Sequence, residues 1–179
     1  MRIALISDTH IPTSLDRLPD ELLSQIAGAD AILHAGDIMS NEVLETLNGI
    51  APTTAVAGNM DPPEVAGKLS DRELVLLEGR TIGLKHGHQP HKIQSHYIDQ
   101  PYDAPEMEVF FQLMASQLPE AEIIVFGHFH RAVIRQWEDI LFINPGAVAP
   151  ANGESSFAIL ELDEIVSTRI VPLGKQQRN

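Results

Sequence analysis

The first sixty residues alternate short apolar runs with segments of helical periodicity, and this pattern restricts the fold more than any other feature. Apolar runs typical of buried strands cover Arg2–Ser7, Ala31–His34 and Thr53–Ala57. Between them, Leu18–Ala27 and Glu42–Leu47 space their apolar residues as a helix does. This strand–helix–strand–helix–strand order predicts a mostly parallel sheet with helices packed against it.

The second half of the chain favours antiparallel pairing. Apolar runs joined by short polar turns predict three hairpins, and these are Glu73–Leu77 with Arg80–His86, Ala132–Trp137 with Leu141–Ile143, and Ser156–Leu162 with Val166–Val171. An amphipathic helix is predicted at Glu106–Leu118, before a strand at Ile123–Phe126. Residues 89–105 are expected to form an irregular loop, which would overhang the cluster of polar side chains described below. We expect one α/β domain over 1–173, with a mixed first sheet, an antiparallel-rich second sheet and a polar tail at 174–179.

Composition excludes several classes of function. The 179 residues include no cysteine, which rules out disulfides, zinc–thiolate sites and cysteine nucleophiles. The formal net charge of −13 makes the chain a poor partner for a nucleic-acid polymer or an anionic membrane surface. The apolar start is too short for a signal peptide, and no run approaches the roughly 20 residues of a membrane span. We therefore expect a cytoplasmic protein that acts on a small molecule.

Polar side chains recur directly after the apolar strands. In chain order they are Asp8 and His10, Asp37, Asn59 and Asp61, His86 and His88, and His128 and His130. In open α/β sheets the carboxyl ends of the strands form the ligand crevice, so these groups should converge in space. Hard oxygen ligands mixed with imidazole suit Mn²⁺, Fe²⁺, Zn²⁺, Co²⁺ or Ni²⁺ better than Ca²⁺. The ligands are too many for one ion and fit two ions a few Å apart.

Each of these residues also has an ordinary structural interpretation. A single histidine at a strand end is more often a hydrogen-bonded structural residue, and an aspartate there is usually a turn former or a helix cap. The pair Gly58-Asn59 is most often only a turn. Five strand ends that each deliver metal-competent residues favour the metal site over these alternatives.

The motifs DTH, GD, GN, HGH and GHFH occur in the order that is typical of the calcineurin-like metallophosphoesterases. The short chain and the segments GNMD and NPGAVAP resemble the small YfcE-like subgroup. The resemblance implies a four-layer α/β/β/α sandwich of two mixed sheets flanked by helices. It implies Asp8, His10 and His130 as ligands of a first metal, Asn59, His86 and His128 as ligands of a second, and Asp37 as a bridging carboxylate.

The resemblance also implies a two-metal phosphoesterase, with phosphodiesters favoured over phosphomonoesters and Mn²⁺ favoured over Fe²⁺, Zn²⁺, Ni²⁺, Co²⁺ or Mg²⁺. A bridging water would be activated for attack on phosphorus, with Asp37 and Asn59 in the catalytic centre. Many relatives place a histidine after the asparagine of GN, where this chain has Met60, which cannot donate a proton. The candidates for the leaving-group proton are therefore Asp61, His88 and His10.

Two other functions stay open from the sequence. One is a non-catalytic protein-binding scaffold, like the relative of this subgroup in the retromer coat. The other is a metal-dependent nuclease, which the absence of a GNH motif and the short chain disfavour. The helix face with Phe110, Phe111 and Met114 is expected to be core, and a homo-oligomer contact is the alternative.

Overall fold

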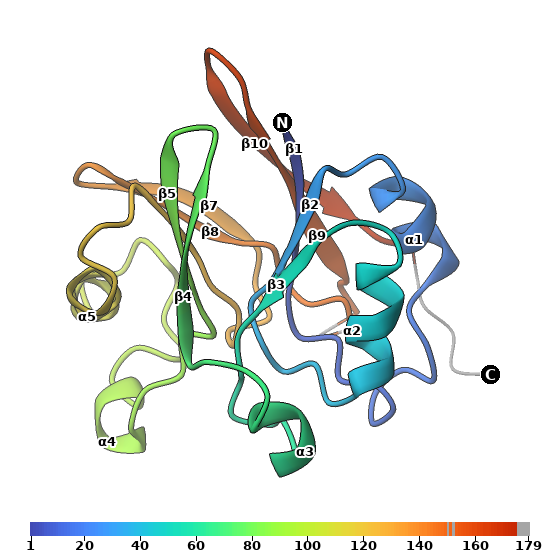
Figure 1. Cartoon of the computed structure of the whole chain (residues 1–179). Coiled ribbons are helices and arrows are strands. Elements are labelled where there is room, and N and C mark those ends of the chain that lie inside the picture. The colour runs from blue at the N-terminus through green and yellow to red at the C-terminus, as the bar shows by residue number, and fades with distance from the viewer. Residues whose placement is uncertain (150, 152, 175–179) are drawn as a thin grey trace.

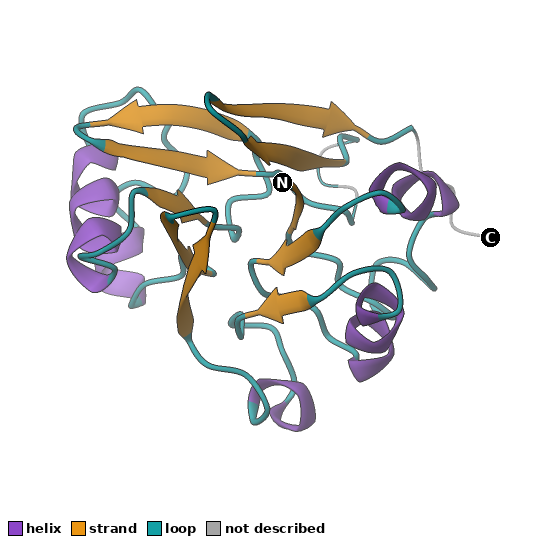
Figure 2. Cartoon of the chain, turned by 45° about the horizontal axis from the view of Figure 1, so that its top comes forward, coloured by secondary structure: helices purple, strands orange, loops and turns teal. Residues whose placement is uncertain are grey.

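The computed structural model describes residues 1–149, 151 and 153–174, which form two five-stranded sheets packed face to face. Figures 1 and 2 show helices on the outer side of each sheet, so the layers follow the order helix, sheet, sheet, helix. This arrangement confirms the four-layer α/β/β/α sandwich expected from the resemblance.

The first sheet has the strand order β10-β9-β1-β2-β3. Its strands are β1 (Arg2–Ile6), β2 (Ala31–His34), β3 (Thr53–Ala55), β9 (Ser156–Leu162) and β10 (Val166–Pro172). Helices α1 (Asp20–Ile26) and α2 (Asn41–Asn48) cover its outer face, and the short α3 (Pro63–Ala66) follows β3. Strands β1, β2 and β3 are parallel, as predicted, whereas β9 pairs antiparallel with β1 and with β10.

The second sheet has the strand order β4-β5-β6-β8-β7. Its strands are β4 (Arg72–Leu77), β5 (Arg80–Lys85), β6 (Ile123–Val125), β7 (Val133–Trp137) and β8 (Ile140–Asn144). Helix α5 (Met107–Gln117) packs on its outer face, and the short α4 (His91–Gln94) lies in the connection from β5 to α5. At 11 residues, α5 is the longest helix in the described part of the chain, and none there could cross a bilayer.

Strand alternation places the core in three apolar layers, because successive side chains point to opposite faces of a sheet. On β1, Ile3 and Leu5 point between the sheets and contact the layer that contains Ile82 from β5. Ala4 and Ile6 point the other way, toward α1 and α2. The third layer lies under α5, and the predicted face with Phe110, Phe111 and Met114 is fully buried there.

Two expectations about the second half need correction. The last hairpin, β9–β10, joins the first sheet, so each sheet contains two parallel and two antiparallel pairs and the second is not antiparallel-rich. The reason is that β9 pairs with β1, which lies near the other end of the sequence. The turn residues of a hairpin do not specify so distant a partner. The segment 89–105 is also not wholly irregular, because it contains α4.

Candidate metal centre

Asp8 directly follows β1 and lies at the seam where the two sheets meet. Its backbone N–H donates to Gly36 O at 3.0 Å, which ties it to the loop after β2. Its Oδ2 accepts from the Ser7 hydroxyl and, at 3.1 Å, from His128 N. Its Oδ1 is buried and has no hydrogen-bond partner among the described residues. The carboxylate is therefore held on one side and presents the other oxygen to the site.

His10 and His130 lie together beside that free oxygen. Their Nε2 atoms are 3.2 Å apart, and His130 Nε2 is 3.1 Å from Asp8 Oδ1. His10 Nε2 is 3.8 Å both from Asp8 Oδ1 and from Asp37 Oδ2. One histidine follows β1 and the other follows β6, so each sheet contributes one nitrogen to this group.

Asp37 and His86 form the second group. His86 Nδ1 donates to Ala35 O at 2.7 Å, which leaves Nε2 as the free ring nitrogen. That Nε2 lies 3.3 Å from Asp37 Oδ2 and 4.0 Å from Asp8 Oδ1. The other oxygen of Asp37 accepts from Met60 N at 2.8 Å. Asp37 Oδ2 thus lies between His10 of the first group and His86 of the second.

These residues fit a metal centre. Two sets of ligand atoms each lie within 4.8 Å of one another, namely Asp8 with His10 and His130, and Asp8 with Asp37 and His86. Asp8 Oδ1 and His86 Nε2 are buried without hydrogen-bond partners in the described residues, an arrangement that costs free energy unless a cation binds them. Carboxylate oxygens and neutral imidazole nitrogens suit a first-row divalent ion.

The backbone at the site is strained, which is typical of functional positions. Asp8, His10, Asp37, His128 and His130 all have positive φ, between 45° and 69°. Residues other than glycine rarely adopt this left-handed conformation. Five of the seven predicted ligands share it, so the loops hold these side chains at a conformational cost.

The charges of the site are coupled. Burial opposes ionisation of Asp37, yet the adjacent His86 ring, whose Nε2 lies 3.3 Å from Oδ2, lowers the pKa of Asp37 to about 2. Burial likewise opposes protonation of His86, but Asp37 and Asp8 raise its pKa to about 8. The pKa of Asp8 is lowered despite full burial, mainly through the His130 ring, whose Nε2 lies 3.1 Å from Oδ1. When no metal is bound, protonated histidines offset the negative charge of the carboxylates.

His128 and His88 lie on the His86 side of the site. The ring centroid of His128 is 5.2 Å from that of His86, and burial together with the His86 charge lowers the pKa of His128 to about 4. The His88 ring is 5.6 Å from His86, and its Nδ1 is buried without a hydrogen-bond partner in the described residues. The rings of His128 and His88 therefore lie near the second group, and His128 also supports it through the hydrogen bond from its backbone N–H to Asp8 Oδ2.

The loop after β3 places Asn59 and Asp61 differently from each other. Asn59 is exposed, next to Met60 whose N–H holds Asp37. The Asp61 carboxylate accepts three backbone N–H groups, from Ile38 and Met39 at 2.7 Å and from Gly58 at 2.8 Å. Asp61 therefore joins the two loops that carry Asp37 and Asn59, and its geometry supports positioning rather than proton donation.

Sequence reasoning missed a buried network under the site. Gly36 N donates to His34 Nδ1 at 3.2 Å, so His34 Nε2 carries the proton and faces Thr9 Oγ1 at 3.3 Å. The Thr9 hydroxyl in turn donates to Ile38 O at 3.1 Å. Burial lowers the pKa of His34 to about 4, which keeps the ring neutral. A buried histidine that ends β2 was the only signal, and an ordinary structural role explains it.

The segment after β8 supports the loop that carries His128 and His130. Asn144 Nδ2 donates to Gly127 O at 2.8 Å, and its Oδ1 accepts from Gly146 N at 2.9 Å. Asn144 thus holds the backbone of Gly127, which directly precedes His128. Position 147 is a buried alanine, so no hydroxyl is available there.

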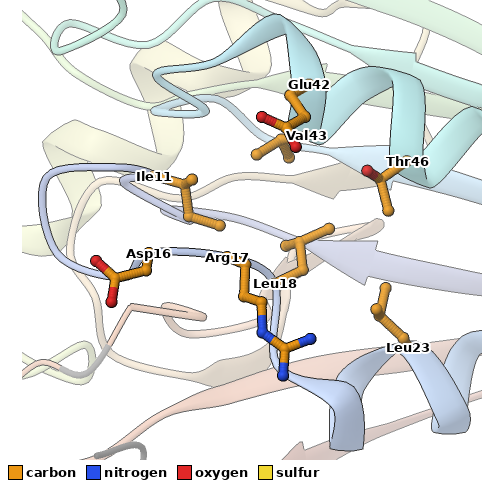
Figure 3. A pocket seen from close by; sticks show the side chains of 8 residues that line it. All are labelled: Ile11, Asp16, Arg17, Leu18, Leu23, Glu42, Val43 and Thr46. Carbon is orange, nitrogen blue, oxygen red and sulfur yellow. The ribbon is translucent and has the colours of Figure 1, made fainter. Parts of the chain in front are cut away.

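A separate hollow of about 200 Å³ lies between α1, α2 and the loop after His10 (Figure 3). Figure 3 shows Ile11, Leu18, Leu23 and Val43 pointing into it, with Arg17 at the side. None of the predicted metal ligands lines this hollow.

Comparisons with known proteins agree over nearly the whole chain. The family model described as the calcineurin-like phosphoesterase superfamily domain matches residues 1–165. A probable metallophosphoesterase of Methanothermobacter thermautotrophicus is 30% identical over 176 residues, which cover 97% of this chain and 94% of that protein. A solution NMR structure of a Thermotoga maritima protein aligns with a TM-score of 0.70 and 31% identity, covering 96% of this chain and 99% of the other.

Two further relatives have names of different kinds. Phosphodiesterase YfcE of Escherichia coli is 27% identical over 185 residues, covering 91% of this chain and 89% of that protein. Vacuolar protein sorting-associated protein 29 of Schizosaccharomyces pombe is 26% identical over 178 residues, covering 96% of this chain and 81% of that protein.

Proposed function

The chain belongs to the calcineurin-like phosphoesterase superfamily, and on that premise we propose that it hydrolyses small phosphate esters with two divalent metal ions. The observation that carries the proposal is the pair of ligand groups that share Asp8 at the seam between the sheets. Phosphodiesters are the favoured substrate class, because relatives named phosphodiesterase align over most of the chain. Mn²⁺ is the favoured ion because of the family resemblance, and the oxygen and imidazole ligands suit first-row divalent ions in general.

In this proposal Asp8, His10 and His130 hold the first ion, His86, His128 and Asn59 hold the second, and Asp37 contacts both. Two divalent ions would supply an activated water as the nucleophile and neutralise charge on the phosphoryl oxygens.

The protein's own groups set the geometry of that centre. The hydrogen bond from His86 Nδ1 to Ala35 O fixes the ring so that Nε2 faces the carboxylates. The bonds from Met60 N and His128 N hold one oxygen each of Asp37 and Asp8, which leaves the other oxygens free to bind metal. Because these supports are backbone groups, the centre is organised before substrate arrives.

The leaving-group proton has two candidates left once Asp61 is assigned to the loop contacts. His88 is half-buried beside the second group, with its ring centroid 5.6 Å from that of His86. His10 faces the first group. His88 is favoured as the proton donor, since the free ring nitrogen of His10 is proposed to bind the metal.

Replacement of the shared carboxylate tests the proposal. We expect Asp37→Ala to abolish metal-dependent hydrolysis of p-nitrophenyl phosphate esters, because its Oδ2 lies between both groups. Asp139→Ala, at an exposed turn between β7 and β8, is the matched control and should keep full activity. Full activity in Asp37→Ala would sink the two-metal proposal.

A protein-binding scaffold is the second candidate, and one surface feature favours it. Leu74 and Leu76 are 43% and 71% exposed on β4, which is an edge strand of the second sheet. An edge strand with exposed leucines is suited to protein contact. If the purified protein binds no divalent metal and hydrolyses no phosphate ester with any added ion, the scaffold is the better description.

A further inference from the structure

A glutamine on α4 contacts one of the proposed metal ligands. Gln94 Oε1 lies 3.1 Å from His128 Nε2. The same oxygen accepts from the backbone N–H of Gln89 at 3.1 Å. A backbone N–H can bond only to the oxygen of a carboxamide, so the Gln89 bond fixes which end of the Gln94 side chain faces the histidine.

The direction of this contact determines where His128 carries its proton. Because Gln94 Oε1 is an acceptor, His128 Nε2 must donate and therefore carries the hydrogen. In a neutral ring the lone pair is then on Nδ1, and only a nitrogen without hydrogen can bind a metal. We propose that Gln94 is a positioning residue that sets the tautomer of His128, so that this histidine binds the second metal through Nδ1. The inference rests on the proposed two-metal function.

The segment that carries Gln94 is attached to the same loop as the histidine. Arg131, which follows His130, donates through Nη2 to Ile98 O at 3.0 Å and to Gln100 O at 2.8 Å. Tyr102 OH donates back to Arg131 O at 2.9 Å. Helix α4 is thus fastened on its C-terminal side to the metal loop itself, so Gln94 and His128 keep their relative position.

The expected size of the effect follows from other metal sites. Partners that orient a ligating histidine typically change metal affinity by about 10–100-fold when they are removed. Gln94→Met keeps the length of the side chain and loses the acceptor, and we expect the affinity of one of the two Mn²⁺ sites to fall within that range. Gln94→Glu keeps an acceptor for both donors and should retain or strengthen that site.

The first measurement is the tautomer in the metal-free full-length protein. Ring ¹⁵N chemical shifts, with His128 identified by comparison with His128→Asn, should show the hydrogen on Nε2 in the wild type and a mixture of tautomers in Gln94→Met. A wild-type ring with its hydrogen on Nδ1 would overturn the proposal. This measurement needs no metal and no activity, so its outcome does not depend on the proposed function.

The second measurement is titration with Mn²⁺, followed by calorimetry and by metal content. Gln94→Met should weaken one site and leave the other unchanged, whereas Gln112→Met, exposed on α5, should match the wild type. Equal affinities in Gln94→Met and Gln112→Met would refute the positioning role. Fewer than two Mn²⁺ sites in the wild type would instead contradict the two-metal function. In that case the tautomer measurement alone would decide whether Gln94 sets the proton position of His128.

Discussion

Asp61, in the loop after β3, has two candidate roles: a proton donor for the leaving group, or a support that holds two loops together. From the sequence, Asp61 is a candidate for the leaving-group proton. In the structure its carboxylate accepts three backbone N–H groups at 2.7–2.8 Å and connects that loop to the one that carries Asp37. A proton donor and a loop support respond differently to Asp61→Asn, which removes the acid but keeps one oxygen.

The magnitudes follow from the three bonds. At about 1 kcal/mol net for each partly exposed bond, Asp61→Ala should lower the free energy of unfolding by about 3 kcal/mol. Asp61→Asn keeps the two bonds to Oδ1 and turns an amide N–H toward Gly58 N, which should cost about 1–2 kcal/mol. In a chain of this size 1 kcal/mol shifts Tm by about 2–4 °C, so we expect losses of about 6–12 °C for Asp61→Ala and about 2–8 °C for Asp61→Asn.

Thermal unfolding and hydrolysis of p-nitrophenyl phosphate esters, measured on the same preparations, provide the assay. As a loop support, Asp61→Asn should keep a substantial part of kcat, and Asp61→Ala should lose metal affinity together with stability. If both variants melt within about 2 °C of the wild type and both are inactive, the support role is refuted and proton donation is restored.

Two further predictions concern the packing and the charge of the centre. Gly127→Ala should lower metal uptake and Tm, because the added Cβ would overlap Ser7 Oγ. The control Gly28→Ala, whose Cβ would meet only the end of the Arg2 side chain, should change neither, and equal uptake in both variants would contradict this. Because the pKa of His86 is raised from 6.5 to about 8, its stabilisation is complete below pH 6.5 and lost as pH rises through about 8. Tm of the metal-free protein should therefore fall over this range, and less so in His86→Asn; parallel profiles would show that His86 does not cause the fall.

The convergence of these side chains is predictable from the sequence, because the sequence determines which residues stand at the end of each strand. Asp8, Asp37 and His86 each lie one to three residues beyond a strand, and parallel strands bring such positions to one edge. The continuous apolar run of β1 likewise predicts a strand that is buried on both faces. These inferences need only local order and the geometry of a strand.

Contacts that depend on folding of distant segments could not be predicted in this way. Gln94 lies in a connection with no strand pattern, and nothing local links it to His128. The left-handed backbone at Asp8 and His10 is imposed by the surrounding loops, since neither residue type requires it. Likewise, the hairpin pattern of β9 fits either sheet equally well, so the sequence does not specify that β9 lies beside β1.

The proposed centre draws its ligands from both halves of the sandwich, with Asp8 and Asp37 after strands of the first sheet and His86 and His128 after strands of the second. Bound ions would therefore clamp the two sheets across their seam. A ligand that binds only the folded state stabilises it by about 2.7 kcal/mol at 100 times its Kd. Because separation of the sheets would destroy both groups at once, the supply of divalent metal would set how long the folded protein persists as well as whether it can turn over substrate.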